Sequence, residues 1–444
     1  MKELYKQKAD SGSNWTPRIL YIVYWGGLEP LGRSLVVPAV EELASLGAKI
    51  DLVTFDKPEH LAGRDDANAL RKSLKGRAIR WISLRYHKNP KIPATMVDII
   101  NGFVRGLSLG LRRRPDVVHA RTFIGGLIGL CVSAVLRTKL VYHNEGFYPD
   151  EQVDGGVWAA GSAPHRLARW LEGQMYAKAD GVIVLSNRAK AVIENLPAVN
   201  RKRTPIITVP SCVDMAHFVA DLPKRAPSKE PAQQGLRLIY IGSVGGRYHL
   251  DKIGRFAAVA SQLLDGVTLR ILTKAEPDLV ASMLDMGGLK RESWSLDCVS
   301  RKEMPNELAC ADAGLFFLSS GISEHGCSPT KVGEYWAMGL PVVTTHNVSD
   351  NDEIIKSESV GVILADHSDQ SYEQAVEELL LLLRDPQTPE RCRLAAERHY
   401  SLAPACRRQA ALYDTILTTP VSREHFTSGA RLGDSRAHTP KGLK

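Results

Sequence analysis

The sequence predicts an α/β protein made of two tandem Rossmann-like domains with a cleft between them, and three observations carry this prediction. The 444 residues exceed what one ordinary hydrophobic core holds and suit two domains of roughly 200 residues each. Short apolar runs alternate with helical stretches in both halves, as in doubly wound parallel sheets. A polar, proline-rich stretch, "VADLPKRAPSKEPAQQG", separates the halves.

The N-terminal half begins with a strand, a glycine-bearing turn, a helix and a second strand. "RILYIVYW" (18–25) precedes "GGLEPLGRS", a helical stretch closes on Gly47, and "AKIDLVTF" (48–55) follows. This order is one half of a doubly wound sheet. Three further buried runs repeat the pattern, at 116–120, 139–143 and 180–186. We assign 1–17 to an N-terminal tail and 18–212 to this first domain.

The C-terminal half contains six more buried runs separated by helical stretches. They occupy 236–242, 267–273, 293–299, 313–319, 341–345 and 361–365. Because parallel strands gather their carboxyl ends at one edge of a sheet, two such domains predict a ligand cleft between them. We expect helices near 371–383 and 403–417 to close the fold. The assigned segments are a linker (213–235), a second domain (236–402), a closing helix (403–418) and a disordered tail (419–444).

Composition favours a cytoplasmic protein. The longest apolar stretch, "FIGGLIGLCVSAVL" (123–136), is too short to span a bilayer and predicts a buried helix. The N-terminus lacks the apolar region of a signal peptide. The seven cysteines are scattered and form no Cys-x-x-Cys pair, which is typical of free thiols in a reducing compartment and indicates neither disulfides nor a zinc site.

Positive charge is concentrated in one segment, which we call the basic block (71–114). The formal net charge is +8, and the basic block holds twelve Lys and Arg residues against a single acid, Asp98. Such a surface can attract nucleic acid, anionic lipid headgroups or an anionic substrate, unless it is merely a solvated face. Trp81, Tyr86 and His87 lie within the basic block, which makes base stacking conceivable.

The segment "SPTKVGEYWAMGLPVV" (328–343) predicts a short, well-punctuated helix. Ser328 is a good N-cap and Pro329 suits the first helical position. Gly339 and Pro341 supply the stop. A helix start leaves backbone N–H groups without partners and carries the positive end of the helix dipole, so it can bind an anion.

Two charged side chains on this helix fit a nucleotide diphosphate. Lys331 adds positive charge to the first turn. Glu334 lies six residues after Ser328, about 9 Å along the axis, which is close to the distance from a diphosphate to its ribose. A carboxylate accepts two hydroxyl hydrogen bonds well, so Glu334 can hold the ribose diol. The simpler reading is a capped helix with a solvated Lys and Glu.

Together with its flanking residues, this segment resembles the signature of a known enzyme family. "GCSPTKVGEYWAMGLPVVTT" resembles the signature of retaining glycosyltransferases of family 4, which are two-domain GT-B enzymes that use nucleotide-activated sugars. The resemblance runs from about residue 18 to 417. Weaker segments fall in the order expected for the family: "RWISLRYHKNP", "DVVHAR", "GFYPDEQVDGGVW", "ADGVIVLS", "VPSCVDMAHF", "IYIGSVGGRYHLDK" and "ACADAGLFFL".

The resemblance implies a donor site in the second domain. Glu334 falls on the second glutamate of the family's Glu-x7-Glu pattern, which binds the nucleotide ribose. The first glutamate, which touches the donor sugar, is replaced by Gly326, and Glu324 and His325 are out of register. Ser328 and its two successors fall where backbone amides meet the diphosphate.

Two basic residues that many family members carry are also replaced. Ser243 stands at the expected Arg and Tyr248 at the expected Lys, so Lys331, with Arg247 second, must supply the positive charge. The nucleotide-contacting residues predicted in this way are Gly26, Gly27, Gly242, Ser243, Arg247, Ser328, Pro329, Thr330, Lys331 and Glu334.

On the N-terminal side, the resemblance places His143 at the end of a strand facing the cleft, where it is a sugar-positioning or catalytic candidate beside Lys331 and Glu334. The turn at Gly26 and Gly27 would approach the diphosphate, or it is only a tight turn. The sequence also contains an acidic loop, which either orders the acceptor or is a solvated face. Its members are Glu145, Asp150 and Glu151. His119 matches a family position whose role is mostly structural.

The function implied is transfer of a sugar from a UDP- or GDP-sugar to a glycan or lipid-linked acceptor with retention, in cell-surface polysaccharide or glycolipid biosynthesis. No cofactor or metal is expected, since the nucleotide-sugar is a substrate. A dehydrogenase is disfavoured because Gly-x-Gly-x-x-Gly is absent. "DND" (350–352) lies too late for a metal-dependent single-domain transferase.

A different class of function remains open, a non-catalytic protein that binds anionic membranes or nucleic acid through the basic block. The resemblance places that block inside the first domain, on the acceptor side. Peripheral docking on anionic lipid at the inner face of the cell membrane therefore fits better, and no nucleic-acid partner is expected.

Overall fold

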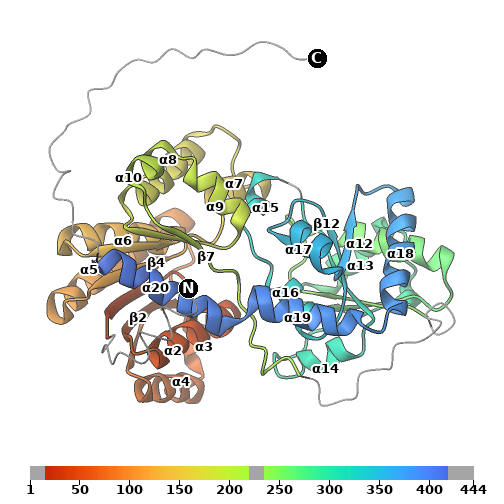
Figure 1. The fold of residues 1–444 in the computed structure, drawn as a ribbon, viewed down its shortest axis with the longest axis horizontal. Helices are drawn as coiled ribbons and strands as arrows, with labels where there is room; N and C mark the ends of the chain where they lie inside the picture. Colours follow the sequence, from red (N-terminus) through yellow and green to blue (C-terminus); the bar gives the residue numbers. More distant parts are fainter. Residues whose placement is uncertain (1–15, 220–234, 320, 419–444) are drawn as a thin grey trace, which may run out of the picture.

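The computed structural model describes residues 16–219, 235–319 and 321–418, which form two parallel sheets flanked by helices (Figure 1). The first sheet has the order β3-β2-β1-β4-β5-β6-β7 and the second β10-β9-β8-β11-β12-β13. The predicted fold class, two tandem Rossmann-like domains, is confirmed.

The strands of the first sheet are β1 (Arg18–Val23), β2 (Lys49–Asp56), β3 (Ile79–Arg85), β4 (Val117–Arg121), β5 (Lys139–His143), β6 (Gly181–Val184) and β7 (Ile206–Thr208). Those of the second sheet are β8 (Arg237–Ile241), β9 (Thr268–Leu272), β10 (Trp294–Asp297), β11 (Ala313–Phe316), β12 (Val342–Thr345) and β13 (Gly361–Leu364).

The helices before the crossing to the second domain are η1 (Gly32–Val36), α2 (Val37–Ser45), α3 (Pro58–Ala62), α4 (Arg64–Gly76), α5 (Lys91–Arg113), α6 (Phe123–Leu136), α7 (Tyr148–Asp154), α8 (Ala163–Lys178), α9 (Asn187–Glu194) and α10 (Pro197–Lys202). Those after it are α12 (Leu250–Leu263), α13 (Pro277–Met286), η2 (Arg291–Ser293), α14 (Met304–Ala309), α15 (Ile322–His325), α16 (Thr330–Ala337), α17 (Asn351–Glu358), α18 (Asp369–Arg384), α19 (Thr388–Tyr400) and α20 (Leu402–Thr418).

Both faces of the first sheet are covered, as expected for a doubly wound fold. Along β1, Ile19, Tyr21 and Val23 belong to one buried hydrophobic cluster, while Leu20 and Ile22 belong to the cluster on the other face. Strand β1 therefore reads as a continuous apolar run in the sequence.

The chain crosses between the domains twice. Val213 donates its backbone N–H to the Tyr400 carbonyl at 2.9 Å, and Phe218 is buried in the core of the second domain. Helix α20 then returns to the first domain, where Leu412 and Tyr413 join its core (Figure 1). The described part of the predicted linker, 213–219, thus packs against the second domain, whereas 1–15, 220–234 and the tail from 419 lie outside the described residues.

A group of hydrogen bonds joins the two domains beside the cleft. Asp350 accepts hydrogen bonds from the Asn187 and Arg188 amides, at the start of α9, at 2.8 and 3.2 Å. The Arg188 guanidinium donates to Asn347 at 2.8 Å and to Asp352 at 3.2 Å. The first and last residues of the "DND" segment therefore connect the two domains.

Every predicted strand is present, and 139–143 matches β5 residue for residue. The 123–136 helix coincides with α6. Strands β3 and β7 and helix α19 were not predicted. Strand β3 lies at an edge of the sheet, where exposed Arg80 and Arg85 interrupt the apolar run, and β7 has only three residues.

Candidate functional site

A cavity of about 400 Å³ lies between the two domains, as the predicted cleft requires. The first domain contributes side chains that follow its strands, among them Tyr24, Trp25 and Glu145. The second domain contributes the end of β11 and the segment that leads into α16. Five of the predicted site residues line the cavity: Arg247, Ser328, Pro329, Thr330 and Lys331.

The start of α16 is open to the cavity, although the predicted cap is wrong. The N-cap is Pro329 rather than Ser328, no side chain caps the helix, and Thr330 is the first helical residue. The Ser328 hydroxyl instead accepts a hydrogen bond from the Ser211 backbone N–H of the first domain at 3.0 Å. The uncapped start leaves backbone N–H groups directed toward any anion that enters the cavity. The predicted stop holds, because Gly339 adopts φ 75° directly after the helix.

Lys331 lies in an aromatic cage. Its Nζ is 4.1 Å from the centroid of the Tyr248 ring, 5.2 Å from that of Phe316 and 5.7 Å from that of Tyr240. Burial lowers the pKa of Lys331 to about 8, although nearby Glu334 opposes this shift. Within the described part of the chain, no carboxylate pairs with Lys331 within 4.0 Å. Such an ammonium group is available to an incoming anion.

Gly242 provides the space for the Lys331 side chain. It adopts φ +128°, and a Cβ there would lie 2.0 Å from Lys331 Cε and 2.2 Å from Nζ. Any side chain at this position would displace the lysine. This close approach explains why position 242 is a glycine, which the sequence pattern alone did not explain.

Glu334 lies one turn beyond Lys331 and does not line the cavity. It is half-buried, and burial raises its pKa to about 7 against the opposing effects of Arg301 and Lys331. A group with such a pKa exchanges its proton near neutral pH. Its contact with a ribose stays a prediction, because no ligand tests it.

Gly326 packs directly against the first domain. A Cβ there would meet the Phe147 ring at 3.0 Å and the Gly146 Cα at 3.1 Å. A glutamate at this position would therefore collide with the first domain. Glu324 does not replace it, since its fully buried carboxylate accepts hydrogen bonds from the Gly321 N–H at 2.8 Å and the Ser323 hydroxyl at 3.0 Å.

Arg247 connects the two sides of the cavity. Its guanidinium lies 3.5 Å from Glu324 in the second domain and 3.8 Å from Glu151 in the first. Burial raises the pKa of Glu151, and the Arg247 charge opposes this shift. The Arg247 charge is therefore already shared between two carboxylates, which leaves Lys331 as the cation better suited to a phosphate.

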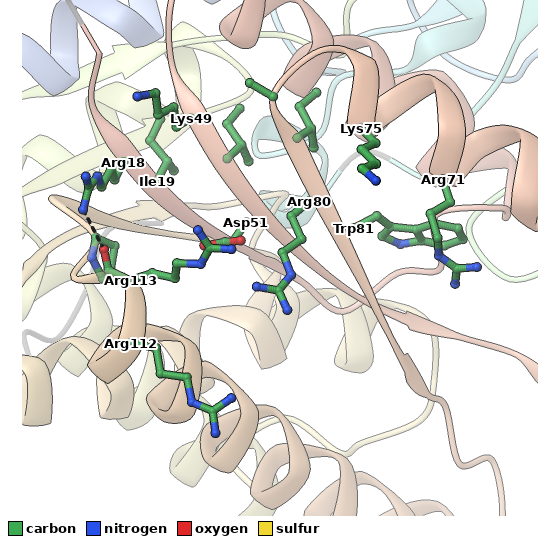
Figure 2. A pocket seen from close by; sticks show the side chains of 14 residues that line it. Arg18, Ile19, Lys49, Asp51, Arg71, Lys75, Arg80, Trp81, Arg112 and Arg113 are labelled. Atoms are coloured by element: carbon green, nitrogen blue, oxygen red, sulfur yellow. Dashed lines mark hydrogen bonds between the residues drawn. The ribbon is translucent and has the colours of Figure 1, made fainter.

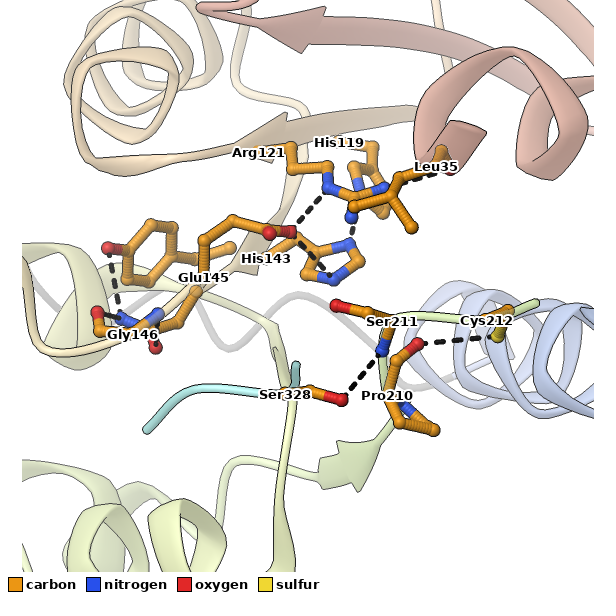
Figure 3. Close-up of polar contacts among 12 residues, drawn as sticks. Leu35, His119, Arg121, His143, Glu145, Gly146, Pro210, Ser211, Cys212 and Ser328 are labelled. Carbon is orange, nitrogen blue, oxygen red and sulfur yellow. Dashed lines mark hydrogen bonds and ion pairs between the residues drawn. The ribbon is translucent and has the colours of Figure 1, made fainter. Parts of the chain in front are cut away.

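His143 is the centre of a buried polar chain (Figure 3). Its Nδ1 is 3.2 Å from His119 Nε2, and its Nε2 is 3.4 Å from Glu145. His119 Nδ1 lies 2.6 Å from the Tyr413 hydroxyl on α20. Burial lowers the pKa values of both histidines well below the usual value, and neighbouring Arg121 adds to this effect, so both are neutral.

Only one end of this buried polar chain reaches the cavity. His143 is 1% exposed, whereas Glu145 lines the cavity wall. The geometry therefore places His143 behind Glu145 rather than in the cavity wall. His119 lies one step further back. The neutral chain fits proton donation from Tyr413 to His119 and from His119 to His143, and it leaves the proton on His143 Nε2, which makes no hydrogen bond to the described residues.

Arg121 is a site residue that sequence reasoning missed. It is 4% exposed, pairs with Glu145 through Nε, and donates to the Leu35 carbonyl at 3.3 Å (Figure 3). Burial raises the pKa of Glu145, which the Arg121 charge opposes. The sequence feature that could have identified Arg121 is an arginine at the carboxyl end of a buried strand, in "DVVHAR".

Four further predicted residues do not line the cavity: Gly26, Gly27, Asp150 and Ser243. Cβ atoms added at Gly26 and Gly27 would meet Asp56 at 2.9 Å and Trp81 at 3.1 Å, so close packing requires both glycines. Ser243 is exposed. Asp150 lies on α7 and pairs with Arg169 at 3.1 Å. Glu145 and Glu151 are the members of the predicted acidic loop that face the cavity.

Two family models match most of the sequence. Residues 36–211 match the one described as "Glycosyl transferase 4-like domain", and residues 235–381 match the one described as "Glycosyl transferases group 1". No curated protein matches the sequence.

Solved structures with the same architecture align along nearly the whole chain. Sucrose-phosphate synthase from Thermosynechococcus elongatus is 13% identical, covers 90% of this chain and 99% of its own, and has a TM-score of 0.65. A glycosyltransferase from Rickettsia africae is 16% identical, with 91% and 100% covered and a TM-score of 0.65. Anabaena HepE in complex with UDP and glucose is 13% identical, with 90% and 100% covered and a TM-score of 0.62.

Proposed function

Because this chain belongs to the family 4 glycosyltransferases with the GT-B fold, we propose that it transfers a hexose-like unit from a UDP- or GDP-sugar to a glycan or lipid-linked acceptor. The proposal includes retention at the anomeric carbon and a place in cell-surface polysaccharide or glycolipid synthesis on the cytoplasmic side. The observation that carries it is Lys331, which lies in an aromatic cage beside the uncapped start of α16 in the cavity between the domains and pairs with no carboxylate of the described residues.

In this proposal the second domain stabilises the leaving group. When the bond from the anomeric carbon to the diphosphate oxygen breaks, the electron pair stays on that oxygen. The N–H groups of α16 and the Lys331 ammonium stabilise the resulting charge. Glu334 holds the ribose, and hinge closure between the domains completes the site.

The first domain faces the acceptor. Glu145 and Glu151 line the cavity opposite α16 and can accept hydrogen bonds from sugar hydroxyls. Arg121 holds Glu145 in place, and His143 lies 3.4 Å from it. With Gly326 at the position of the sugar-contacting glutamate, these two carboxylates are the nearest candidates for contacts to the donor sugar.

A screen of nucleotides and nucleotide-sugars by thermal shift tests the proposal. Anabaena HepE binds UDP and UDP-glucose in its solved complexes, so these ligands come first, followed by GDP and GDP-sugars. At 100 times its dissociation constant, a bound ligand adds about 2.7 kcal/mol to the free energy of unfolding. Absence of stabilisation by any nucleotide at millimolar concentration would refute the proposal, and sugar transfer to an acceptor would complete its support.

Affinity for UDP is expected to fall as the pH rises through about 8. The ammonium form of Lys331 binds the diphosphate, and a bound anion raises the lysine pKa, so each further pH unit costs up to about tenfold in affinity. Isothermal titration calorimetry between about pH 7 and about pH 9.5 measures this. Lys331→Met should lack the fall in affinity above about pH 8, and absence of this fall in the unaltered protein would contradict the prediction.

A further inference from the structure

Helix α5 exposes a long apolar face. Its members are 45–78% exposed and lie at helical spacing, so they share one side of the helix: Ile92, Met96, Val97, Ile100, Val104 and Leu111. We call this set the α5 stripe. A stripe of this length on the surface of a water-exposed domain marks a site of interaction.

The opposite face of α5 is firmly attached to the domain. A Cβ at Gly102 would lie 2.7 Å from Ile128 on α6, and one at Gly110 would lie 2.1 Å from Leu136. These contacts seat α5 closely on α6, so the stripe is a fixed part of the surface. The α5 stripe runs from Ile92 to Leu111, which is about 29 Å along the helix axis.

The charged residues that flank the stripe in the sequence are positive. Lys88 and Lys91 precede it, and three arginines follow from Arg112 to Arg114. The one acid of this segment, Asp98, is fully buried. It accepts hydrogen bonds from the Tyr24 hydroxyl at 2.7 Å and from the His87 backbone at 3.1 Å.

A basic pocket of about 760 Å³ extends this charge from the end of α5 along the amino edge of the sheet (Figure 2). Its lining contains a single acid, Asp51, and seven basic residues: Arg18, Lys49, Arg71, Lys75, Arg80, Arg112 and Arg113. Figure 2 shows that these side chains come from separate elements around one opening. The positive surface is therefore assembled by the fold and is wider than the helix end.

We propose that the first domain docks on an anionic lipid bilayer, with the α5 stripe in the interfacial layer and the basic residues against the phosphate headgroups. A bilayer surface offers apolar depth and negative charge side by side, and this combination matches the stripe and its flanks. A nucleic acid would leave the stripe uncovered. In the described parts of the chain, no helix is long and apolar enough to cross a membrane, so contact at the surface is the mode available to these helices.

Docking through α5 would bring the cavity to the bilayer. Helix α5 starts directly after β3 and the loop that follows it, on the carboxyl side of the sheet, and Asp98 on α5 holds Tyr24, which lines the cavity. An acceptor carried by a lipid would then enter from the membrane side. The docking itself goes beyond the proposed function and does not depend on it.

Flotation of the full-length protein with vesicles tests the docking without any donor or acceptor. One set contains phosphatidylcholine alone, and the other contains about one third phosphatidylglycerol. The protein should float with the anionic vesicles and stay behind with the neutral ones. Ile100→Glu/Val104→Glu places two charges in the stripe and should reduce the bound fraction about tenfold or more at the same melting temperature.

The matched control is Met286→Glu, because Met286 is 76% exposed on α13 in the other domain and should leave flotation unchanged. Equal flotation with neutral vesicles, or full flotation of the double variant, would overturn the proposal. The proposal would also be overturned if the unaltered protein bound no vesicles and formed a dimer that the double variant separates into monomers. Retention on RNA without flotation would assign the surface to nucleic acid instead.

Discussion

Replacing Lys331 by Met is expected to weaken UDP binding by about 10- to 150-fold, because a charge-assisted contact of roughly 1.5 to 3 kcal/mol is lost. The methionine keeps most of the apolar volume in the cage of Tyr240, Tyr248 and Phe316. Only the charge at the start of α16 disappears. Isothermal titration calorimetry at pH 7 gives the affinity directly.

The same change should not destabilise the ligand-free protein. The folded-state pKa of Lys331, about 8, lies below its ordinary value of 10.5, so the charged form is disfavoured by folding. Between these two pKa values the unfolded state binds more protons, and stability rises with pH across that window. Lys331→Met removes this cost, so the free energy of unfolding at pH 7 should stay equal or increase.

Loss of affinity together with retained stability separates a binding role from a folding role. Lys290→Met is the control, because Lys290 is an exposed lysine of the same domain. It should change neither quantity. If Lys331→Met bound UDP as tightly as the unaltered protein, the anion site at α16 would have to be abandoned.

Much of the fold could be predicted because its signals are local. Buried strands of a parallel sheet are continuous apolar runs, and Gly339 and Pro341 end α16 by their own backbone geometry. The missed strands β3 and β7 have weak local signals, whereas the wrong N-cap came from a partner distant in the sequence. Ser328 has the composition of an N-cap, yet the Ser211 amide of the other domain engages its hydroxyl.

The candidate site divides in the same way. The position of Lys331 at the start of α16 follows from the helix pattern, but its cage draws on β8, the loop before α12 and β11, which no local pattern brings together. The chain behind Glu145 ends on Tyr413, which is 294 residues away from His119. Only the return of α20 to the first domain makes that contact.

The largest stability effect is expected at Arg121, where Arg121→Met should lower the free energy of unfolding by about 3 to 5 kcal/mol. The variant removes one partner of a buried ion pair and leaves the Glu145 carboxylate without its main counter-charge. Urea denaturation monitored by a probe in the first domain measures the loss. Arg201→Met, at an exposed arginine on α10, should stay within about 0.5 kcal/mol.

A compensating change decides whether the unpaired charge causes that loss. Glu145→Gln in the Arg121→Met background removes the stranded carboxylate and keeps its shape, so it should restore about half or more of the lost free energy. Glu145→Gln alone leaves a buried guanidinium without its partner and should also destabilise. If the double variant were no more stable than Arg121→Met, packing against Trp25 and the bond to the Leu35 carbonyl would explain the loss instead. Restored stability without restored sugar transfer would then show that the Arg121–Glu145 pair serves the reaction as well as the fold.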